Sequence, residues 1–224
     1  MRNMVGFRYE DLGKIEYRDA LCIQTEAFQK LIDAKISKQS AESVLFLCEH
    51  FPVFTLGKNG LASNLLVSDL ILEAQGISLY KTNRGGDITF HGPGQITGYP
   101  VFDLEAFGLG LRQYVETIEE IIIRFLTLYG IRGERLPGAT GVWLEPGTER
   151  ARKICAIGIK SSRFVTMHGF ALNINTELHY FSLINPCGFK DKGVTSLSTE
   201  LDREIPINIC KEQLTALFAE MFRN

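Results

Sequence analysis

Residues 141–174 read GVWLEPGTERARKICAIGIKSSRFVTMHGFALNI, and this stretch decides the predicted fold class. Three short apolar runs, at 141–144, 154–159 and 164–174, follow one another with only turns between them. Residues 145–151 contain a Pro-Gly pair and are typical of a turn between the first two strands. Strands in such a run, without an intervening helix, predict an α+β fold with a mixed or mostly antiparallel sheet flanked by helices.

Helices and further strands are predicted on both sides of this strand-rich region. Three segments carry apolar residues three and four positions apart, as amphipathic helices do, and two are short apolar runs typical of strands. No repeat, low-complexity tract or linker interrupts the chain, so we expect one domain over residues 1–224. The predicted helices are 17–37, 111–129 and 211–223, and the further strands are 43–48 and 77–82.

The composition is that of an ordinary globular protein. The 224 residues are 45% hydrophobic and 22% charged, and a net charge of −2 gives no global field that would attract nucleic acid. The N-terminus lacks the apolar stretch of a secretion signal. The most apolar helical window, 118–129, is interrupted by Glu119, Glu120 and Arg124, which excludes a membrane span. We therefore expect a cytoplasmic protein that binds neither nucleic acid nor membrane.

The cysteines and histidines form no recognisable metal site. The five cysteines are scattered, with no CxxC pair, which argues against a disulfide framework and against a cysteine-based zinc site. The four histidines lack the HxxxH spacing that places two ligands on one face of a helix. We expect no metal and no cofactor. The residues concerned are Cys22, Cys48, Cys155, Cys187, Cys210, His50, His91, His168 and His179.

The segment RGGDITFHGPGQ at 84–95 is the strongest local anomaly. Four glycines in twelve residues are costly for a mere connector, and glycines let backbone N–H groups approach a ligand closely. The segment is not a P-loop, because no Gly-Lys-Ser/Thr closes it, and Gly98 comes one residue too late for a dinucleotide fingerprint. From composition alone, a ligand-binding loop and a structural loop with a turn at Pro93-Gly94 are equally good interpretations.

Cys187 is the candidate nucleophile. It lies in the sequence NPCG, where Pro186 favours an extended chain and Gly188 permits a tight, exposed backbone. We expect a cysteine between these residues to lie on a loop. Most single cysteines in cytosolic proteins are instead small buried hydrophobic residues. The other four cysteines carry no comparable signal.

Alternation along the predicted strands assigns faces to two polar residues. Lys153 falls on the face of Cys155 and Ile157, where a lysine is either a strand-end residue with its amine in solvent or a desolvated functional amine. His168 falls on the face of Phe170, which predicts a buried, hydrogen-bonded histidine rather than a base.

Five cations and no acid occur between positions 150 and 163. The usual interpretation of such a run is a solvent-exposed face. The more specific interpretation is a docking surface for an acidic partner protein. The five are Arg150, Arg152, Lys153, Lys160 and Arg163.

Several long motifs occur in the order that a known family shows. They are RGGDITFHGPGQITGYPVFDL at 84–104, KICAIGIK at 153–160, HGFALNIN at 168–175, NPCGFKDKGVTSL at 185–197 and, in addition, PVFTLGKNG at 52–60. These motifs resemble the lipoyl(octanoyl) transferase family of lipoate biosynthesis, over about residues 44–198. The resemblance implies an α+β fold shared with biotin protein ligases and lipoate ligases.

The resemblance also implies an activity. Such enzymes transfer an octanoyl (or lipoyl) group from acyl carrier protein to a lysine on the lipoyl domains of lipoate-dependent enzymes, the first step of endogenous protein lipoylation. The implied acceptors are the lipoyl domains of 2-oxoacid dehydrogenases and the glycine cleavage H protein. Cys187 would carry the acyl group as a thioester, and Lys153 would lower the pKa of the Cys187 thiol and act as acid and base.

The implied contacts to the acyl group fall in three short segments of the chain. They are Arg84, Gly85, Gly86, Asp87, Ile88, Thr89, Phe90 and His91; Ala156, Ile157 and Gly158; and Gly169, Phe170 and Ala171. The long turn EPGTERA at 145–151 departs from the family pattern and could alter the docking of either protein partner.

Transfer from a thioester to an amine also needs hydrogen-bond donors for the negative charge that develops on the carbonyl oxygen. We expect the backbone N–H groups of Gly188 and of residues 84–87 to supply them. The ammonium form of Lys153 would stabilise the thiolate and its neutral form would deprotonate the acceptor, so Cys187 and Lys153 are expected to titrate as a coupled pair. An acyl-enzyme predicts ping-pong kinetics.

Three other functions stay open at this point. A lipoate ligase would activate the free acid with ATP and would need no cysteine nucleophile. A cysteine thioesterase would form the same acyl-enzyme but release octanoate to water. A module without catalytic activity would bind acyl carrier protein and turn nothing over. Independence of ATP separates the first from a transferase, and the fate of an acyl adduct separates the second.

Overall fold

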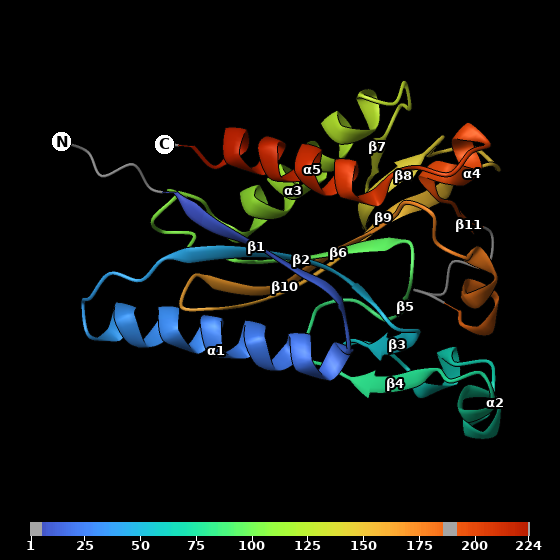
Figure 1. The fold of residues 1–224 in the computed structure, drawn as a ribbon, viewed down its shortest axis with the longest axis horizontal. Helices are drawn as coiled ribbons and strands as arrows, with labels where there is room; N and C mark the ends of the chain where they lie inside the picture. The colour runs from blue at the N-terminus through green and yellow to red at the C-terminus, as the bar shows by residue number, and fades with distance from the viewer. Residues whose placement is uncertain (1–5, 186–191, 224) are drawn as a thin grey trace.

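The structure, a computed structural model, describes residues 6–185 and 192–223 and is built around a large mixed β-sheet (Figure 1). Its strands are β1 (Phe7–Ile15), β2 (Ser43–His50), β6 (Gln95–Val101), β7 (Glu134–Leu136), β8 (Ala139–Leu144), β9 (Arg152–Ser162), β10 (Val165–Asn173) and β11 (Gly193–Val194). They lie in the order β1-β2-β6-β10-β9-β8-β7, and β11 pairs with β9 outside this path. The pairs β1–β2 and β11–β9 are parallel and the others antiparallel.

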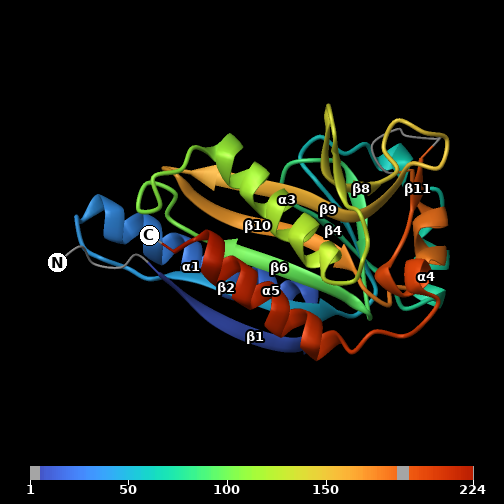
Figure 2. The same ribbon diagram turned by 90° about the horizontal axis from the view of Figure 1, so that it is seen from above.

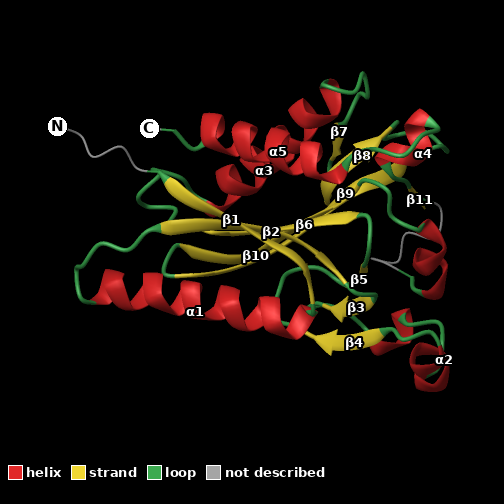
Figure 3. Ribbon diagram, in the orientation of Figure 1, coloured by secondary structure: helices red, strands yellow, loops and turns green. Residues whose placement is uncertain are grey.

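Helices cover both faces of this sheet (Figure 3). α1 (Tyr17–Ile36) packs on one face through a buried stripe that includes Ala20, Phe28 and Leu31. α3 (Leu111–Thr127) and α5 (Ile207–Met221) pack on the other face and lie side by side when the molecule is seen from above (Figure 2). Because β10 lies in the middle of the sheet with helices on both faces, all of its residues are buried.

A second, three-stranded sheet holds part of the glycine-rich segment. It has the order β4-β3-β5, with β3 (Val53–Leu56), β4 (Ser78–Lys81) and β5 (Ile88–His91). The expectation that residues 84–95 form a loop is therefore only partly right. The turn at Pro93-Gly94 is present, but it joins β5 to β6 and carries the chain from the small sheet into the large one. The apolar residues Ile88, Phe90 and Ile96 are buried there, and burial outweighs the flexibility of the glycines.

The predicted α+β fold is confirmed, and most predicted elements are present with shifted ends. The helices at 17–37 and 111–129 match α1 and α3, whereas the last helix begins earlier than predicted, at Ile207. β10 begins at Val165, because Arg163 and Phe164 have φ angles of 50° and 61° and form a tight turn after β9. The short elements η1 (Ala62–Asn64), α2 (Asp69–Ala74), η2 (Leu178–Leu183) and α4 (Leu197–Leu201), together with β1 and β3, were not predicted.

Over residues 6–185 and 192–223, no helix is both long and apolar enough to cross a bilayer. In the same residues, no three His, Cys, Asp or Glu side chains gather as a metal site requires.

Candidate active site

A cavity of about 550 Å³ is lined by the small sheet, by β9 and β10 and by the N-terminal part of α3. Lys153 lines it, as do the acyl-contact residues expected in the three segments 84–91, 156–158 and 169–171, with Phe90 as the exception. These segments are far apart in the sequence, and the pairing of β9 with β10 brings the last two into register. Cys187 and Gly188 lie outside the described residues.

Phe90 does not line this cavity but packs in the core of the small sheet. Its ring stacks on Tyr180, with 4.4 Å between the ring centroids, and meets Phe54 edge-on at 5.6 Å. The reason is strand alternation, since the neighbours Thr89 and His91 both line the cavity and Phe90 points the other way. The expectation that Phe90 contacts the acyl group is not supported.

Arg84 organises the wall of the cavity. Its guanidinium donates to Thr55 Oγ1 at 2.9 Å and Thr55 O at 2.5 Å, and to Asp87 O at 2.7 Å, so it holds residues 84–87 against β3. β9 approaches this loop so closely that a Cβ at Gly158 would lie 2.7 Å from Gly85 O and 3.3 Å from Arg84 Cδ. Only glycine fits there.

The contact between β9 and residues 84–87 also uses one of the backbone N–H groups expected to stabilise an oxyanion. The Gly85 N–H donates to Ile159 O at 3.0 Å, across the junction between the loop and β9. This donor is therefore already used within the fold, so the oxyanion donors expected within residues 84–87 do not include the Gly85 N–H.

A β-bulge sets the direction of Lys153. Val142 pairs with Cys155 and Trp143 with Lys153, so Ile154 is an extra residue in β9. Ile154 and Cys155 are both fully buried in the main core, and Lys153 is left on the cavity side with Ala156. The predicted shared face of Lys153 and Cys155 is thus wrong, because regular alternation was assumed where the strand carries a bulge.

The Lys153 amine has two well-defined partners on β8. Nζ donates to Thr140 O at 3.2 Å and lies 4.6 Å from the centroid of the Trp143 ring. The Trp143 indole is itself fixed, since Nε1 donates to Ala139 O at 2.9 Å and the side chain is buried. A carbonyl oxygen and a π-face both stabilise the ammonium form. The Lys153 side chain therefore lies in the cavity wall, on partners that suit a cation.

The polar side chains from the small sheet and α1 are held neutral. His91 Nδ1 donates to Gln95 Oε1 at 2.9 Å, its Nε2 lies 3.2 Å from Thr55 Oγ1, and burial keeps its pKa well below the usual value. Burial also raises the pKa of Tyr17 to about 12. A histidine kept neutral in this way cannot supply a cation beside a thiolate, which argues against His91 as the partner of the nucleophile.

His168 is buried and hydrogen-bonded as predicted, but it lies in a different place. Its φ of 59° interrupts the regular strand geometry, and its Nε2 lies 2.8 Å from Asn83 Oδ1 in the cavity wall. Phe170, predicted on the same face, packs in the main core against Phe218. Burial lowers the pKa of His168 to about 3, so this imidazole is also neutral.

Three of the described cysteines are structural. Cys48, Cys155 and Cys210 are buried, and burial raises the pKa of each thiol above its usual value. A thiol with a raised pKa holds little thiolate at neutral pH and is a poor nucleophile. Cys22 is exposed on α1 and does not line the cavity.

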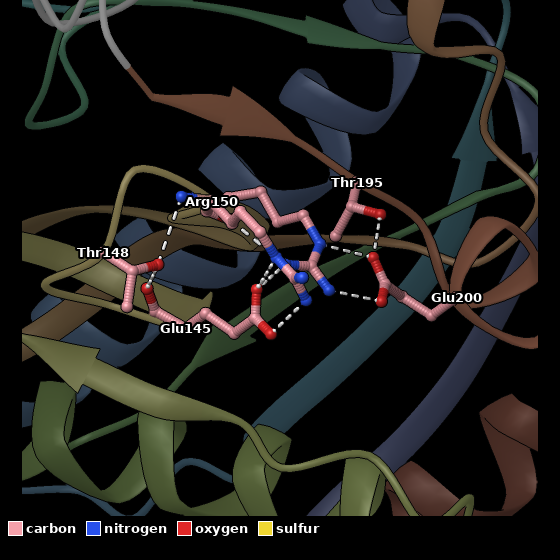
Figure 4. A network of polar contacts seen from close by, with 6 residues as sticks. Glu145, Thr148, Arg150, Thr195 and Glu200 are labelled. Atoms are coloured by element: carbon pink, nitrogen blue, oxygen red, sulfur yellow. Dashed lines mark hydrogen bonds and ion pairs between the residues drawn. The ribbon is translucent and has the colours of Figure 1, made fainter.

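The cluster of cations at 150–163 is partly neutralised (Figure 4). Arg152 makes two hydrogen bonds of 2.6 Å to Glu200 and one of 2.8 Å to Glu145. Arg150 also pairs with Glu145, at 2.6 Å. Two of the five cations therefore have acidic partners, which lie outside the segment and are brought to it by the fold.

The same network fastens β11 beside Lys153. Glu200, on α4, accepts from Thr195 Oγ1 at 2.6 Å, and the Thr195 N–H donates to Lys153 O at 3.0 Å. Gly193 N donates to Ala151 O at 2.9 Å. The chain that follows the segment 186–191 is thus anchored directly to the strand that carries the amine.

Sequence reasoning missed several residues of the cavity wall. Thr140 and Trp143 matter most because they contact the Lys153 amine, and their only sequence signal is a short apolar strand at 141–144. The polar residues missed on the opposite wall have no local signal, since elements distant in the sequence bring them together. These are Tyr17, Gln95, Thr97, Tyr99 and Asn173.

Known proteins share both the sequence and the fold of this chain. The model of the lipoyl protein ligase A/B catalytic domain matches residues 17–219. An octanoyltransferase of Parabacteroides distasonis is 63% identical over 220 residues, which make up 98% of this chain and 100% of that relative.

Two solved structures bear on the fold alone, because both are under 25% identical. A bi-partite lipoate protein ligase from Thermoplasma acidophilum, studied with its E2 lipoyl domain, gives a TM-score of 0.70 at 16% identity, over 97% of this chain and 84% of that one. The biotin protein ligase of Aquifex aeolicus, in complex with biotin and ATP, gives 0.53 at 10% identity, over 96% and 70%. The expected likeness to lipoate and biotin protein ligases is confirmed.

Proposed function

The chain belongs to the lipoyl protein ligase A/B catalytic domain family and is an acyltransferase, and we propose that it moves an octanoyl (or lipoyl) group from acyl carrier protein to a lysine of a lipoyl domain. The acceptors are the lipoyl domains of 2-oxoacid dehydrogenases and the glycine cleavage H protein. The acyl group passes through a thioester on Cys187, and the reaction takes place in the cytoplasm without a metal or cofactor.

The observation that carries this proposal is the position of Lys153. Its amine enters a cavity of about 550 Å³ whose wall contains the segments expected to bind an acyl chain. The two histidines that line the described part of the wall, His91 and His168, are held neutral by burial. An acyl chain and a titratable amine can therefore meet here.

The reaction divides into two half-reactions. The Cys187 thiolate attacks the thioester carbonyl, the bond to the carrier's sulfur breaks, and the carrier leaves as a thiol with the proton that the Lys153 ammonium gives up. The acceptor lysine then attacks the Cys187 thioester, an amide forms and the Cys187 thiolate leaves. In the first step the Lys153 ammonium stabilises the thiolate, and in the second the neutral amine takes the proton that the acceptor nitrogen loses.

Activation of the thiol accounts for only part of the rate. A free thiol with a pKa near 8.5 is already a few per cent ionised at neutral pH, so complete ionisation raises the thiolate by about 30-fold, or about 2 kcal/mol. Positioning of the two substrates and donors to the oxyanion supply the remainder, at about 3 kcal/mol for each well-placed donor.

The test is the intact mass of the purified protein after incubation with octanoyl-acyl carrier protein. We expect a gain of one octanoyl group in the wild type and none in Cys187→Ala, and we expect an apo lipoyl domain to discharge the adduct as octanoyl-lysine. An adduct that decays equally fast without the acceptor favours a thioesterase. Octanoylated acceptor formed without any adduct would remove Cys187 as the nucleophile, and a requirement for ATP would favour a ligase.

A further inference from the structure

We propose that Glu119, on α3, is a positioning residue for Lys153 and acts through the single peptide unit that joins Thr140 to Gly141. Glu119 does not line the cavity and touches no reacting atom. Its carboxylate fixes and polarises the carbonyl that binds the Lys153 amine, and so favours the ammonium form. The inference rests on the proposed function only in the use that the reaction makes of that amine.

The geometry links the carboxylate to the amine in two hydrogen bonds. The Gly141 N–H donates to Glu119 Oε1 at 3.0 Å, and the Lys153 ammonium donates to Thr140 O at 3.2 Å. That N–H and that C=O belong to one trans peptide, in which they point in opposite directions. A negative charge on the N–H side strengthens the carbonyl as an acceptor, because hydrogen bonds in a chain polarise one another.

The backbone is shaped for this arrangement. Gly141 has φ 123°, a conformation that side chains with a Cβ rarely adopt, and a Cβ there would lie 2.5 Å from Cys155 O. The chain therefore needs glycine at the position where the peptide turns its N–H toward α3 and its carbonyl toward Lys153. The β9 bulge at Ile154 lies across from the next two residues of β8, Val142 and Trp143.

Arg135 binds the Glu119 carboxylate from the side away from the Gly141 peptide. Arg135 Nε donates to Glu119 Oε2 at 3.1 Å, and the Glu119 side chain is only 9% exposed. Arg135 also pairs with Glu120, at 3.0 Å, and Glu120 pairs with Arg124. The carboxylate that faces the Gly141 peptide is thus the buried member of a small charged network whose other members are more exposed.

The charged and titratable groups around the Thr140–Gly141 peptide come from several elements. Besides Glu119 and Glu120 they are Arg135 on β7, Lys153 and Cys155 on β9, and Lys192, which lines the same cavity ahead of β11. Arg124 pairs with Glu220 of α5 as well as with Glu120. Both Glu119 and Lys153 act on the pKa of the Cys155 thiol, Glu119 raising it and Lys153 lowering it, beneath the larger rise due to burial.

The experiment compares two neighbouring carboxylates that share Arg135. Glu119→Gln keeps an oxygen for the Gly141 N–H but removes the charge, whereas Glu120→Gln removes a charge beside the same arginine without touching the peptide. Protein carrying 13C-labelled lysine is titrated by NMR, and the Lys153 Cε signal is assigned by its loss in Lys153→Arg.

We expect the titration midpoint of Lys153 to fall by roughly half a pH unit or more in Glu119→Gln, because the ammonium loses a favourable charge, and to stay within about 0.2 units in Glu120→Gln. Arg135→Gln should move the midpoint upward, since it removes a cation and leaves the Glu119 charge less neutralised. Opposite signs at two positions of one network distinguish an electrostatic effect from local unfolding.

The rate of the amide-forming half-reaction provides the second readout. Its ascending limb on the pH–rate profile should move to lower pH in Glu119→Gln by the same amount as the NMR midpoint. Equal midpoints in the wild type and Glu119→Gln, or equal shifts in Glu119→Gln and Glu120→Gln, would overturn the inference. A shifted midpoint with an unmoved rate profile would support the role of Glu119 and count instead against Lys153 as the base of the proposed function.

Discussion

The two sides of one cavity differ in the charge state that they favour for the side chains in their walls. On the side of α1 and the small sheet, Tyr17, His91 and Tyr99 are buried, and burial moves each of their pKa values away from neutrality in the direction that keeps the group uncharged. On the side of β8 and β9, Lys153 meets a carbonyl and an aromatic face, which both favour a cation.

The difference between these two sides separates binding from chemistry. Neutral polar groups with hydrogen-bond partners inside the protein do not exchange protons with a ligand. A wall of such groups suits an apolar chain. An amine with charge-stabilising partners gives one place where a proton can move. Residue type alone does not make this distinction, since a histidine would ordinarily be the better candidate near pH 7.

Replacement of Lys153 tests the comparison most strongly. Lys153→Met should lower octanoyl transfer by at least about 100-fold, the usual contribution of a general acid or base. His91→Gln should weaken transfer less and leave the shape of the pH–rate profile unchanged, because His91 does not titrate in the working range. Steady-state transfer to an apo lipoyl domain between pH 6 and 9 measures both. A Lys153→Met variant with most of its activity would reverse the assignment.

Two buried histidines, one in the cavity wall and one in the core beside it, predict a loss of stability in mild acid. Burial lowers the pKa of His50 to about 4 and of His168 to about 3, so below about pH 6.5 the unfolded chain binds protons that the folded one refuses. Stability is therefore fully present above that pH and falls as the pH falls toward 4. Each histidine should contribute a loss of roughly 2 kcal/mol between pH 7.5 and 5.

Urea unfolding at the two pH values measures this loss. His50→Gln should flatten the pH dependence even if it lowers stability at pH 7.5. The same slope in the variant and the wild type would show that His50 is protonated in the folded protein.

The strand that carries Lys153 is joined to α4 by an ion pair that lies outside the cavity. Arg152 and Glu200 are 24% and 15% exposed, and their bidentate pair joins β9 to α4. Glu200→Ala should lower the free energy of unfolding by about 1–2 kcal/mol, after discounting for solvent, because Arg152 and Thr195 lose a shared partner. Arg150→Ala, at a side chain that is 76% exposed, is the matched control and should change stability by less than about 0.5 kcal/mol.

The smallest expected effect concerns the turn between the strands that carry Lys153 and His168. Arg163 and Phe164 both have positive φ angles, which an Asn-Gly pair adopts with less strain. The double substitution Arg163→Asn, Phe164→Gly should raise the free energy of unfolding by about 0.5–1 kcal/mol. Unfolding in urea measures it, and a destabilised variant would mean that the packing of the Phe164 ring outweighs the backbone strain.

The fold was predictable from the sequence where a periodic pattern extends over many residues. The stripe of Ile118, Ile121, Ile122 and Phe125 identifies α3 because four apolar residues on one face have no other use in a soluble domain. The strand at β1 has no such pattern, since it pairs with β2 at the edge of the sheet and half of its residues face solvent. The pairing of this edge strand depends on residues distant in the sequence, so the local sequence does not predict it.

The candidate site was predictable through motifs and not through geometry. The glycine-rich segment and the strand around Lys153 are recognisable as sequences, and all but one of the expected and described contact residues line the cavity. What local reasoning could not see is the bulge at Ile154 and the left-handed backbone at His168. Regular alternation assigned the wrong face in both cases. Thr140 contributes only its backbone carbonyl, so its side-chain type carries no signal at all.

Lys153 and Cys155 lie on different faces of β9 because the single extra residue between them, Ile154, forms a bulge. Deleting the single codon for Ile154 would restore regular alternation with Trp143 still opposite Lys153 and Val142 still opposite Cys155, so Lys153 would stay on the cavity side and the core would lose one apolar side chain. The protein would differ by one apolar residue in 224 and would keep every motif recognisable by eye. A strand of the present length without the bulge would instead put Lys153 on the face of Cys155 and bury its amine in the core, so any scaffold that borrows this strand must copy the bulge together with the residues.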